Sequence, residues 1–213
     1  ERFGVYDKMG KFLANSLGSE ETTLFKIVAA YAMFANGGER VIPTLVDRVQ
    51  DRYGKTIYQH DPRSCLDCDN AYLPSRIAPT ILSERERVMD AITAYQLTSM
   101  MQGVVERGTG KDYVRLPVPV AGKTGTTNDY KDSWFVSIDG RYVVTAWLGT
   151  DDNKTTWLSG SSGALPMVSR FYQQVKPEPL SLVPVEGLTF QSFHQKQGTR
   201  IPDNCQQAIV LPA

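Results

Sequence analysis

The residues best suited to chemistry lie together in one short run, Ala121-Gly122-Lys123-Thr124-Gly125-Thr126-Thr127. The run is predicted to be a β-strand, in which Lys123 and Gly125 point to one face and Thr124 and Thr126 point to the other face or to the edge. A lysine in a cleft lined by strand backbone can bind a carboxylate and help to move protons. Gly125 has no Cβ to keep a substrate away from the strand, and unpaired amides at a strand edge can serve as oxyanion-hole donors.

A surface edge strand is the alternative interpretation of the same run. Edge strands often carry a lysine, because its charge discourages pairing with another chain. A motif as short as Lys123-Thr124-Gly125 also occurs by chance. Residues outside the run therefore have to decide between the two interpretations.

Cysteine and histidine offer few further candidates. Cys65 and Cys68 form a C-x-x-C in a polar segment. A local disulfide is one interpretation, and a zinc site is the other, which would need further ligands such as His60, His194 or Cys205. We favour the disulfide, because one C-x-x-C gives an incomplete ligand set, and we predict no metal and no cofactor. His194 lies where no helix or strand is expected to position it, so it is not predicted to be a general base.

Composition excludes several classes of function. The 213 residues suit one domain or a large part of one, and 41% hydrophobic residues are enough for a core. Lys plus Arg number 23 and Asp plus Glu number 23, so the charge balance predicts no nucleic-acid partner. No apolar run approaches the ~20 residues of a membrane helix, and no signal peptide is found. The chain opens at Glu1 without an initiator Met, and we expect it to be cut from something longer.

Two helices are predicted ahead of the run. Apolar residues follow helical spacing from Leu24 to Ala35, with Thr22 or Ser19 as the cap and Asn36-Gly37-Gly38 as the stop. A second helix is predicted over 90–108, capped by Asp90 and ended by Gly108. Its buried stripe is expected to be Ala94, Leu97, Met101, Val104 and Val105. Between the helices, 40–60 predicts two strands joined at Arg52-Tyr53-Gly54-Lys55, and 61–86 predicts a loop.

The run itself falls in a predicted antiparallel sheet with strands over 118–127, 133–138 and 141–148. Asp139-Gly140 favours a type I′ turn between the last two strands. This turn predicts three features of the sheet: Val136 opposite Val143, Trp134 opposite Thr145, and Phe135 and Val144 sharing the other side. Asp132 is interpreted as a turn cap rather than a partner of Lys123.

A third helix is predicted over 165–175, after a polar turn at 151–154 and small residues at 159–164. The chain from 176 onward is rich in proline and is predicted to be an extended tail. The expected domains are therefore 1–175 and a tail over 176–213. Aromatic residues at strand or helix spacing are interpreted as core rather than a ligand box: Trp134, Phe135, Trp147, Phe171 and Tyr172.

Segments spread along the chain resemble the transpeptidase domain of class A penicillin-binding proteins, bifunctional enzymes that polymerise and cross-link bacterial peptidoglycan. The matching segments are 30–38 (A-Y-A-M-F-A-N-G-G), 104–110 (V-V-E-R-G-T-G), 121–128 (A-G-K-T-G-T-T-N) and 131–135 (K-D-S-W-F). Their order and spacing make the set specific over about residues 1–175. The resemblance implies an α+β fold, an antiparallel sheet flanked by helices, of which this chain would be the C-terminal portion.

The resemblance also implies a role for each residue of the run. Lys123 would lie near the nucleophile and steer the substrate carboxylate, and Thr124 and Thr126 would hydrogen-bond that carboxylate. The Thr126 amide would form half of an oxyanion hole, so Lys123 and Thr126 are the predicted catalytic residues. Gly125 would keep the strand open, and Thr127 completes the predicted substrate-binding set. The S-x-x-K with the nucleophilic serine and the S-x-N motif are absent from the sequence, so the isolated chain is predicted to be inactive.

The function implied is part of a D,D-transpeptidase that cross-links stem peptides through a serine acyl-enzyme and is a target of β-lactams. The implied partners are stem peptides, β-lactams, the missing N-terminal part of the same domain and a glycosyltransferase domain. The implied location is extracytoplasmic, on the periplasmic side of the inner membrane, anchored by a segment outside this chain.

Two alternatives stay open, a serine β-lactamase and a non-catalytic binding or scaffold module. The Pro-rich tail and the R-G-T-G segment argue against the β-lactamase, and an S-x-x-K within ~100 residues before Glu1 would support the transpeptidase over the scaffold. Residues up to about 110 look like the a-type subgroup and later ones like the b-type, which a divergent homologue or a composite of the two would explain.

Overall fold

The computed structural model describes residues 1–61, 63–66, 80–82, 85–111, 118–205 and 207–213. The chain divides into two compact units. The larger unit comprises 1–41 and 88–213, and the smaller unit comprises 42–87.

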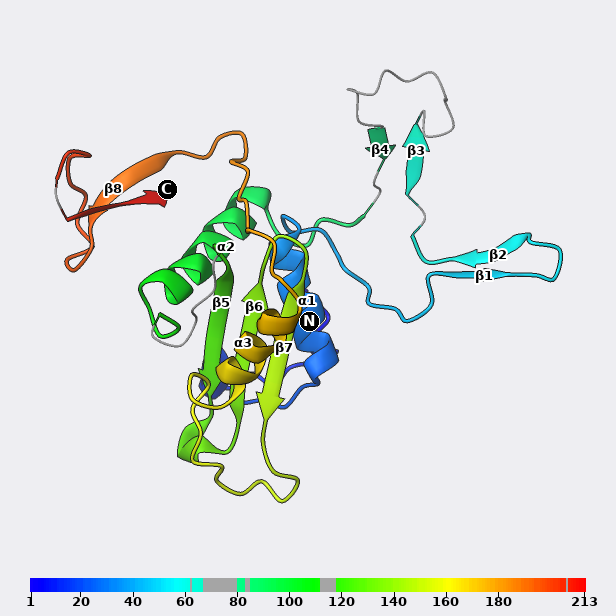
Figure 1. Cartoon of the computed structure of the whole chain (residues 1–213), viewed down its shortest axis with the longest axis horizontal. Helices are drawn as coiled ribbons and strands as arrows, with labels where there is room; N and C mark the ends of the chain where they lie inside the picture. The colour runs from blue at the N-terminus through cyan, green and yellow to red at the C-terminus, as the bar shows by residue number, and fades with distance from the viewer. Residues whose placement is uncertain (62, 67–79, 83–84, 112–117, 206) are drawn as a thin grey trace. The chain divides into compact units, whose positions relative to one another are not determined.

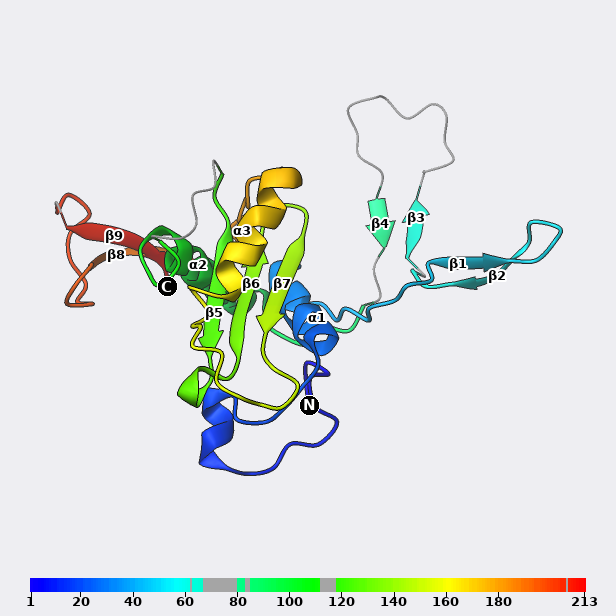
Figure 2. The same ribbon diagram turned by 60° about the horizontal axis from the view of Figure 1, so that its bottom comes forward.

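The larger unit is built on an antiparallel sheet with the strand order β5-β6-β7 (Figure 1). The strands are β5 (Ala121–Thr126), β6 (Ser133–Ile138) and β7 (Val143–Leu148). Helix α3 (Ala164–Gln174) covers one face of the sheet, and α1 (Leu24–Ala35) and α2 (Ala91–Glu106) lie on the other (Figure 2). The predicted sheet, its flanking helices and the α+β class are confirmed.

Each face of the sheet has its own hydrophobic cluster, because side chains alternate along every strand. On the α3 face, Phe135 is 1% exposed and packs with Leu165, Val168 and Tyr172. On the other face, the buried members are Met101, Ala121 and Ile138, with Tyr31 and Phe34 of α1 packed against them. The predicted core positions of Phe135 and Tyr172 are confirmed, whereas Trp147 and Phe171 are 41% and 39% exposed.

The predicted pairing of β6 with β7 is wrong by two residues. Val136 lies opposite Thr145, and Trp134 lies opposite Trp147. The strands are joined by the longer turn Asp139–Tyr142, in which Asp139 Oδ1 accepts a hydrogen bond from the Arg141 amide at 2.7 Å. Asp139 and Gly140 lack the positive φ that a type I′ turn requires.

A shift by two residues leaves every side chain on its original face. Phe135 and Val144 therefore share a face as predicted.

The helix ends are set by hydrogen bonds of their caps. Thr23, and not Thr22 or Ser19, caps α1, because its hydroxyl accepts a hydrogen bond from the Lys26 amide at 3.3 Å. Gly37 and Gly38 follow α1 with φ of 78° and 93°, which confirms the predicted stop.

Asp90 caps α2 as predicted and accepts a hydrogen bond from the Thr93 amide at 3.1 Å. Ala94 and Met101 are buried as predicted, whereas Thr98 is buried without having been predicted to be. The buried Thr98 hydroxyl has a partner, because it donates a hydrogen bond to the Ala94 carbonyl at 2.8 Å. Leu97, Val104 and Val105 are only half-buried.

The prediction of an extended tail is wrong for its later part, because β8 (Phe190–His194) and β9 (Ala208–Pro212) form an antiparallel hairpin, whereas 176–189 contain no helix or strand. Ser192 is buried in β8 and donates to Asp203 Oδ1 at 2.6 Å. His194 ends β8, and its Nδ1 accepts from the amides of Lys196 and Gln197. The expectation that no strand positions His194 is therefore wrong, and its ring holds the turn that follows β8. The domain boundary at residue 175 stays a prediction.

The smaller unit contains two separate hairpins. β1 (Arg48–Gln50) pairs with β2 (Thr56–Gln59) around the predicted turn, which is confirmed. β3 (Ser64–Leu66) pairs with β4 (Thr80–Leu82) where a loop was predicted, so that prediction is wrong. Cys65 lies in β3 and is not a free thiol, whereas Cys205 is free and exposed. Cys68 lies outside the described residues, so its pairing with Cys65 stays a prediction.

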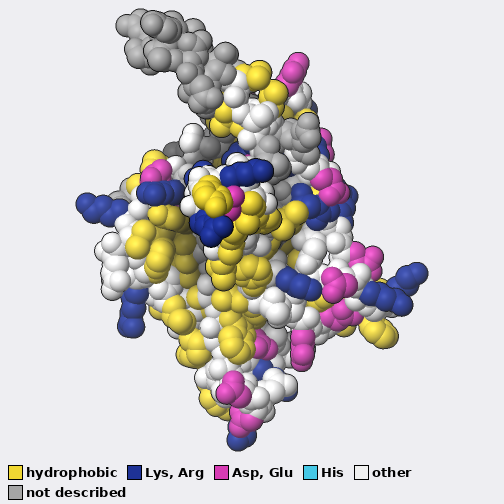
Figure 3. Space-filling view, turned by 90° about the vertical axis from the view of Figure 1, so that its right-hand side faces the viewer, with side chains coloured by type: hydrophobic (Ala, Val, Ile, Leu, Met, Phe, Trp, Pro, Cys, Tyr) yellow, Lys and Arg dark blue, Asp and Glu magenta, His cyan; other side chains and the backbone are white. Residues whose placement is uncertain are grey.

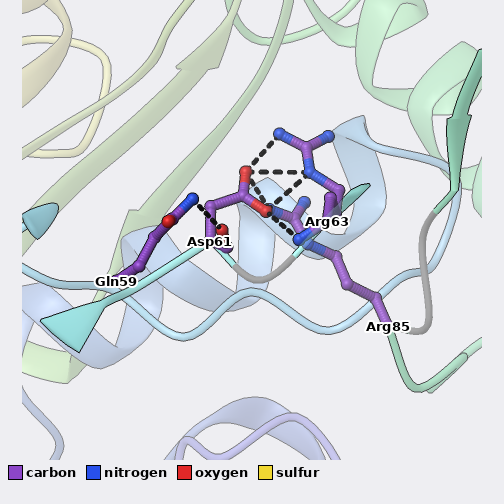
Figure 4. Close-up of polar contacts among 4 residues, drawn as sticks. All are labelled: Gln59, Asp61, Arg63 and Arg85. Carbon is purple, nitrogen blue, oxygen red and sulfur yellow. Dashed lines mark hydrogen bonds and ion pairs between the residues drawn. The ribbon is translucent and has the colours of Figure 1, made fainter. Parts of the chain in front are cut away.

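An acidic side chain between two arginines lies at the base of β3 and β4 (Figure 4). Asp61 Oδ1 accepts hydrogen bonds from Arg63 Nε at 2.8 Å and from the Arg63 amide at 3.1 Å. Arg85 Nη2 forms an ion pair with Asp61 Oδ2 at 3.6 Å. The hydrogen bonds from the Arg63 side chain, and then from its amide, lower the pKa of Asp61 to about 2.

Acid is expected to release this cluster only at low pH. Asp61 has a pKa of 3.8 without these interactions and about 2 with them. The stabilisation is therefore fully present above about pH 4 and is lost as pH falls towards about 2. An NMR titration of the Asp61 carboxyl carbon should give a midpoint near 2, and Arg63→Ala should move it towards 3.8. Arg52→Ala, which removes a guanidinium stacked on Tyr53, should leave the midpoint unchanged, and a wild-type midpoint near 3.8 would contradict the assignment.

Large hydrophobic side chains are exposed in both units. Figure 3 shows hydrophobic side chains on one face of the molecule. Leu13, Leu17 and Leu45 are each more than nine-tenths exposed, at 94%, 93% and 96%. Leu13 and Leu17 belong to one short 3-10 helix, Leu13–Leu17, and so expose apolar side chains close together in the larger unit.

Candidate functional site

The candidate site lies on β5, which is an edge strand of its sheet. β5 pairs with β6 along one side, and no described strand pairs with its other side. Within β5, Ala121 and Gly122 are buried, whereas Lys123 to Thr126 are half-buried or exposed. The half of the strand that carries the chemical side chains is therefore the half that a ligand can reach.

Lys123 is exposed and lies opposite Val136 in the sheet. Its Nζ donates a hydrogen bond to the Thr124 carbonyl at 2.6 Å. Among the described residues, no carboxylate forms an ion pair with this ammonium. Two of its three donors are thus free for an incoming anion.

Thr124 joins β5 to the turn after α2. Its Oγ1 lies 3.0 Å from Thr109 Oγ1, a hydrogen bond in which either hydroxyl can donate. The turn is closed by the Gly110 amide, which donates to the Val104 carbonyl at 3.0 Å. Sequence reasoning singled out the R-G-T-G segment but assigned Thr109 no role. A hydroxyl side chain flanked by Gly108 and Gly110 was the feature of the sequence that could have indicated a role for Thr109.

Thr126 is held by the loop before α3, because its Oγ1 accepts a hydrogen bond from the Gly160 amide at 2.9 Å. Gly125 lies between the two threonines, opposite Trp134. A Cβ on Gly125 would approach Trp134 Cβ to 3.1 Å, so a side chain here would crowd the sheet as well as the ligand. Sequence reasoning did not single out Gly160.

Thr127 closes the turn that follows β5. Its hydroxyl accepts a hydrogen bond from the Asp132 amide at 2.7 Å and donates to Asp132 Oδ2 at 3.1 Å. Trp147 Nε1 donates to the other carboxylate oxygen of Asp132 at 2.9 Å. Asp132 therefore has the structural role that we favoured, and the Thr127 hydroxyl is already committed within the protein.

Strained backbone is concentrated in the loops after β5 and β7. The described non-glycine residues with positive φ are Asp129, Tyr130, Asn153 and Trp157, with φ between 52° and 60°. The two loops are fastened together, since the Thr156 amide and hydroxyl both bond to the Tyr130 carbonyl, at 2.8 and 2.6 Å. Such strain persists only where surrounding structure enforces it, and it often accompanies functional sites.

Two further observations limit the chemistry. Within the described ranges, no group of histidine, cysteine, aspartate or glutamate could hold a metal ion. No helix in the part of the chain that the structure describes is both long and apolar enough to cross a membrane. The side chains gathered on β5 can bind and orient an anionic, extended ligand by charge and hydrogen bonds.

An edge strand bearing Lys-Thr-Gly, with helices on both faces of its sheet, presents an ammonium and hydroxyl groups on its accessible half. Residues 6–163 match the family model of the penicillin binding protein transpeptidase domain. The chain belongs to this family, which confirms the resemblance drawn from its sequence.

Named relatives agree with the family. Penicillin-binding protein 1A of Rickettsia bellii is 39% identical over 191 residues, which cover 85% of this chain and 24% of the relative. Penicillin-binding protein 1B of Haemophilus influenzae is 37% identical over 178 residues, which cover 82% of this chain and 20% of the relative. The chain therefore spans about a quarter of the length of the first of these curated relatives. Both subgroups occur among the relatives, so the subgroup of this chain stays open.

Solved structures show the same fold. Penicillin-binding protein 1A from Haemophilus influenzae superposes with a TM-score of 0.75 at 23% identity, covering 99% of this chain and 35% of that chain. PonA1 from Mycobacterium tuberculosis, in complex with penicillin V, gives a TM-score of 0.59 at 18% identity, covering 86% and 50%.

Proposed function

We propose that this chain supplies the substrate-binding strand of a D,D-transpeptidase that cross-links peptidoglycan stem peptides and is a target of β-lactams. The observation that carries the proposal is the placement of Lys123, Thr124 and Thr126 on the accessible half of an edge strand. The family supports it, because relatives of this chain are penicillin-binding proteins.

Each residue has a role that its environment allows. The Lys123 ammonium would attract the terminal carboxylate of a stem peptide, and the Thr124 and Thr126 hydroxyls would donate hydrogen bonds to it. The peptide would lie along β5, where Gly125 leaves room for its backbone. The Thr126 amide would contribute half of the oxyanion hole that stabilises the tetrahedral intermediate.

The nucleophile has to come from outside this sequence. A serine would attack the D-Ala-D-Ala bond, release the terminal D-Ala and pass the acyl group to an amine of a neighbouring peptide. We propose that a preceding segment of a longer natural protein supplies this serine, together with its S-x-x-K lysine and the S-x-N motif. The exposed leucines at 13 and 17 support such a segment, because they offer apolar surface within the larger unit for it to cover.

The remaining partners and the location follow from the same proposal. A glycosyltransferase domain would accompany the transpeptidase in the longer protein, whose relatives are about four times the length of the matched region. The site would act outside the cytoplasm, where peptidoglycan is cross-linked, and a segment outside this chain would anchor it to the membrane.

A fluorescent penicillin tests the proposal. It should acylate the longer natural protein and should not acylate the 213-residue chain. Labelling of the chain alone would contradict the assignment of the serine to another segment.

Two further outcomes identify the alternatives. No labelling of either protein would favour a non-catalytic binding module, the candidate that the absence of S-x-x-K supports. Labelling followed by rapid release of hydrolysed penicillin would favour a β-lactamase.

A further inference from the structure

The loop over 159–163 lies directly on the backbone of the candidate site. A Cβ built on Gly160 would lie 2.5 Å from the Gly125 carbonyl oxygen, 2.8 Å from the Gly125 nitrogen and 2.6 Å from the Trp134 carbonyl oxygen. Gly125 and Trp134 are opposite each other in the sheet. The Gly160 backbone therefore rests on this pair at a distance that no side chain would permit.

The same loop is fastened to the central strand by Ser133, which is 0% exposed. Ser133 Oγ donates to the Ser159 carbonyl at 2.7 Å and accepts from the Ala164 amide at 2.9 Å. Ser159 and Ser162 also bond to each other, since each hydroxyl accepts from the amide of the other residue, at 2.9 and 3.2 Å. These bonds fix the loop independently of any contact with Thr126.

The bond from Gly160 to Thr126 has a defined direction. An amide N–H can only donate, so Thr126 Oγ1 is the acceptor at 2.9 Å. Among the described residues, no acceptor receives the Thr126 hydroxyl proton. Thr127 differs, because its hydroxyl both accepts and donates within its turn.

We propose that Gly160 is a positioning residue, whose amide occupies one lone pair of Thr126 Oγ1 and so directs the Thr126 hydroxyl proton towards the carboxylate bound on β5. This inference rests on the proposed function of β5. Because the loop is fixed by Ser133, the Gly160 amide is in place before a ligand arrives. The Thr126 hydroxyl is thus oriented to donate a hydrogen bond to the carboxylate. Because the hydroxyl also accepts a hydrogen bond from the Gly160 amide, it becomes a stronger donor.

The test compares a penicillin with its methyl ester, which lacks the carboxylate charge. The ratio of their acylation rate constants on the longer natural protein measures recognition of the carboxylate. Gly160→Ala should reduce this ratio about 3- to 10-fold, the range for one neutral hydrogen bond. Gly103→Ala adds the same methyl group against the flexible end of Arg107 and should leave the ratio unchanged.

Two variants of Thr126 separate positioning from general damage. Thr126→Ser keeps the hydroxyl and should retain the ratio, whereas Thr126→Val should lower it. In the Thr126→Val background, Gly160→Ala should produce no further change in the ratio, because the two residues act through one hydroxyl. A general loss of structure would lower both rate constants together and leave their ratio unchanged.

The outcomes distinguish the inference from the proposed function. A wild-type protein that acylates equally fast with acid and ester would overturn the proposed function, and the inference with it. A wild-type preference for the acid that survives Gly160→Ala would overturn the inference alone.

If Gly160→Ala does not fold, amide hydrogen exchange on the 213-residue chain tests the hydrogen bond from Gly160 to Thr126. Exchange at Gly160 should accelerate in Thr126→Val and stay slow in Thr126→Ser, and equal exchange in the two variants would overturn the inference.

Discussion

Replacing Phe135 with alanine is expected to destabilise the larger unit by about 3–5 kcal/mol, the usual range for a buried phenylalanine. Phe135 lies on the central strand, is 1% exposed and packs between the sheet and α3. Its ring contacts Leu165, Val168 and Tyr172 of α3, so its removal leaves a cavity lined by groups that belong to two elements. A loss of this size is a large share of the ~5–15 kcal/mol by which domains are stable.

Urea unfolding of the 213-residue chain, followed by far-UV circular dichroism, measures this effect. Phe12→Ala is the matched control, because the Phe12 side chain is 71% exposed and its loss should change stability by about 0.5 kcal/mol or less. A loss below ~1.5 kcal/mol for Phe135→Ala would contradict the packing described here, because it would be smaller than the value for a buried aromatic side chain.

The faces of the sheet were predictable from the sequence, and the pairing of its strands was not. Alternation of side chains depends only on neighbouring residues, so Phe135 and Val144 were assigned to the correct face. Pairing depends on the turn, and Asp139 bonds to the Arg141 amide while the Gly140 amide donates to Glu178, far along the chain, at 2.9 Å. The dipeptide rule for Asp-Gly describes an isolated hairpin and does not include such a contact.

The hairpins that were missed share a physical cause. Strands β3 and β4 have three residues each, too few for an alternating pattern to be recognised. Strand β8 contains the polar residues Gln191, Ser192 and His194, and its partner follows only after residues 195–207. Ser192 is nevertheless buried, because Asp203 satisfies its hydroxyl. A pairing that depends on a distant side chain leaves no local signal.

The candidate site shows the same division between local and distant contacts. Lys123, Thr124 and Thr126 were identified from their own run of sequence. Thr109 and Gly160 contact that run through a hydroxyl and an amide from segments before and after it. Every residue except proline carries a backbone N–H, so the residue type does not mark Gly160, and its position beside Thr126 emerges only from the fold.

Replacing Lys123 with methionine is expected to lower the acylation rate constant of the longer natural protein with penicillin about 10- to 100-fold, as for the loss of a charged hydrogen bond. Methionine keeps much of the length of lysine and removes the ammonium that would bind the carboxylate. An ion pair in contact with water contributes only about 0.2–1 kcal/mol. A 10- to 100-fold effect therefore requires the proposed preceding segment to shield Lys123, which is exposed in this chain.

The methyl ester of penicillin separates charge recognition from other effects of Lys123→Met. Its acylation rate constant should change little, because the ester offers no charge for the ammonium to bind. Lys154→Met removes an exposed lysine that is paired with Asp152 in the loop after β7 and should leave both rate constants unchanged. Equal losses with acid and ester would assign Lys123 to proton transfer or folding. A loss confined to the acid that shrinks as salt is added would establish it as the residue that binds the carboxylate, because salt screens such attraction.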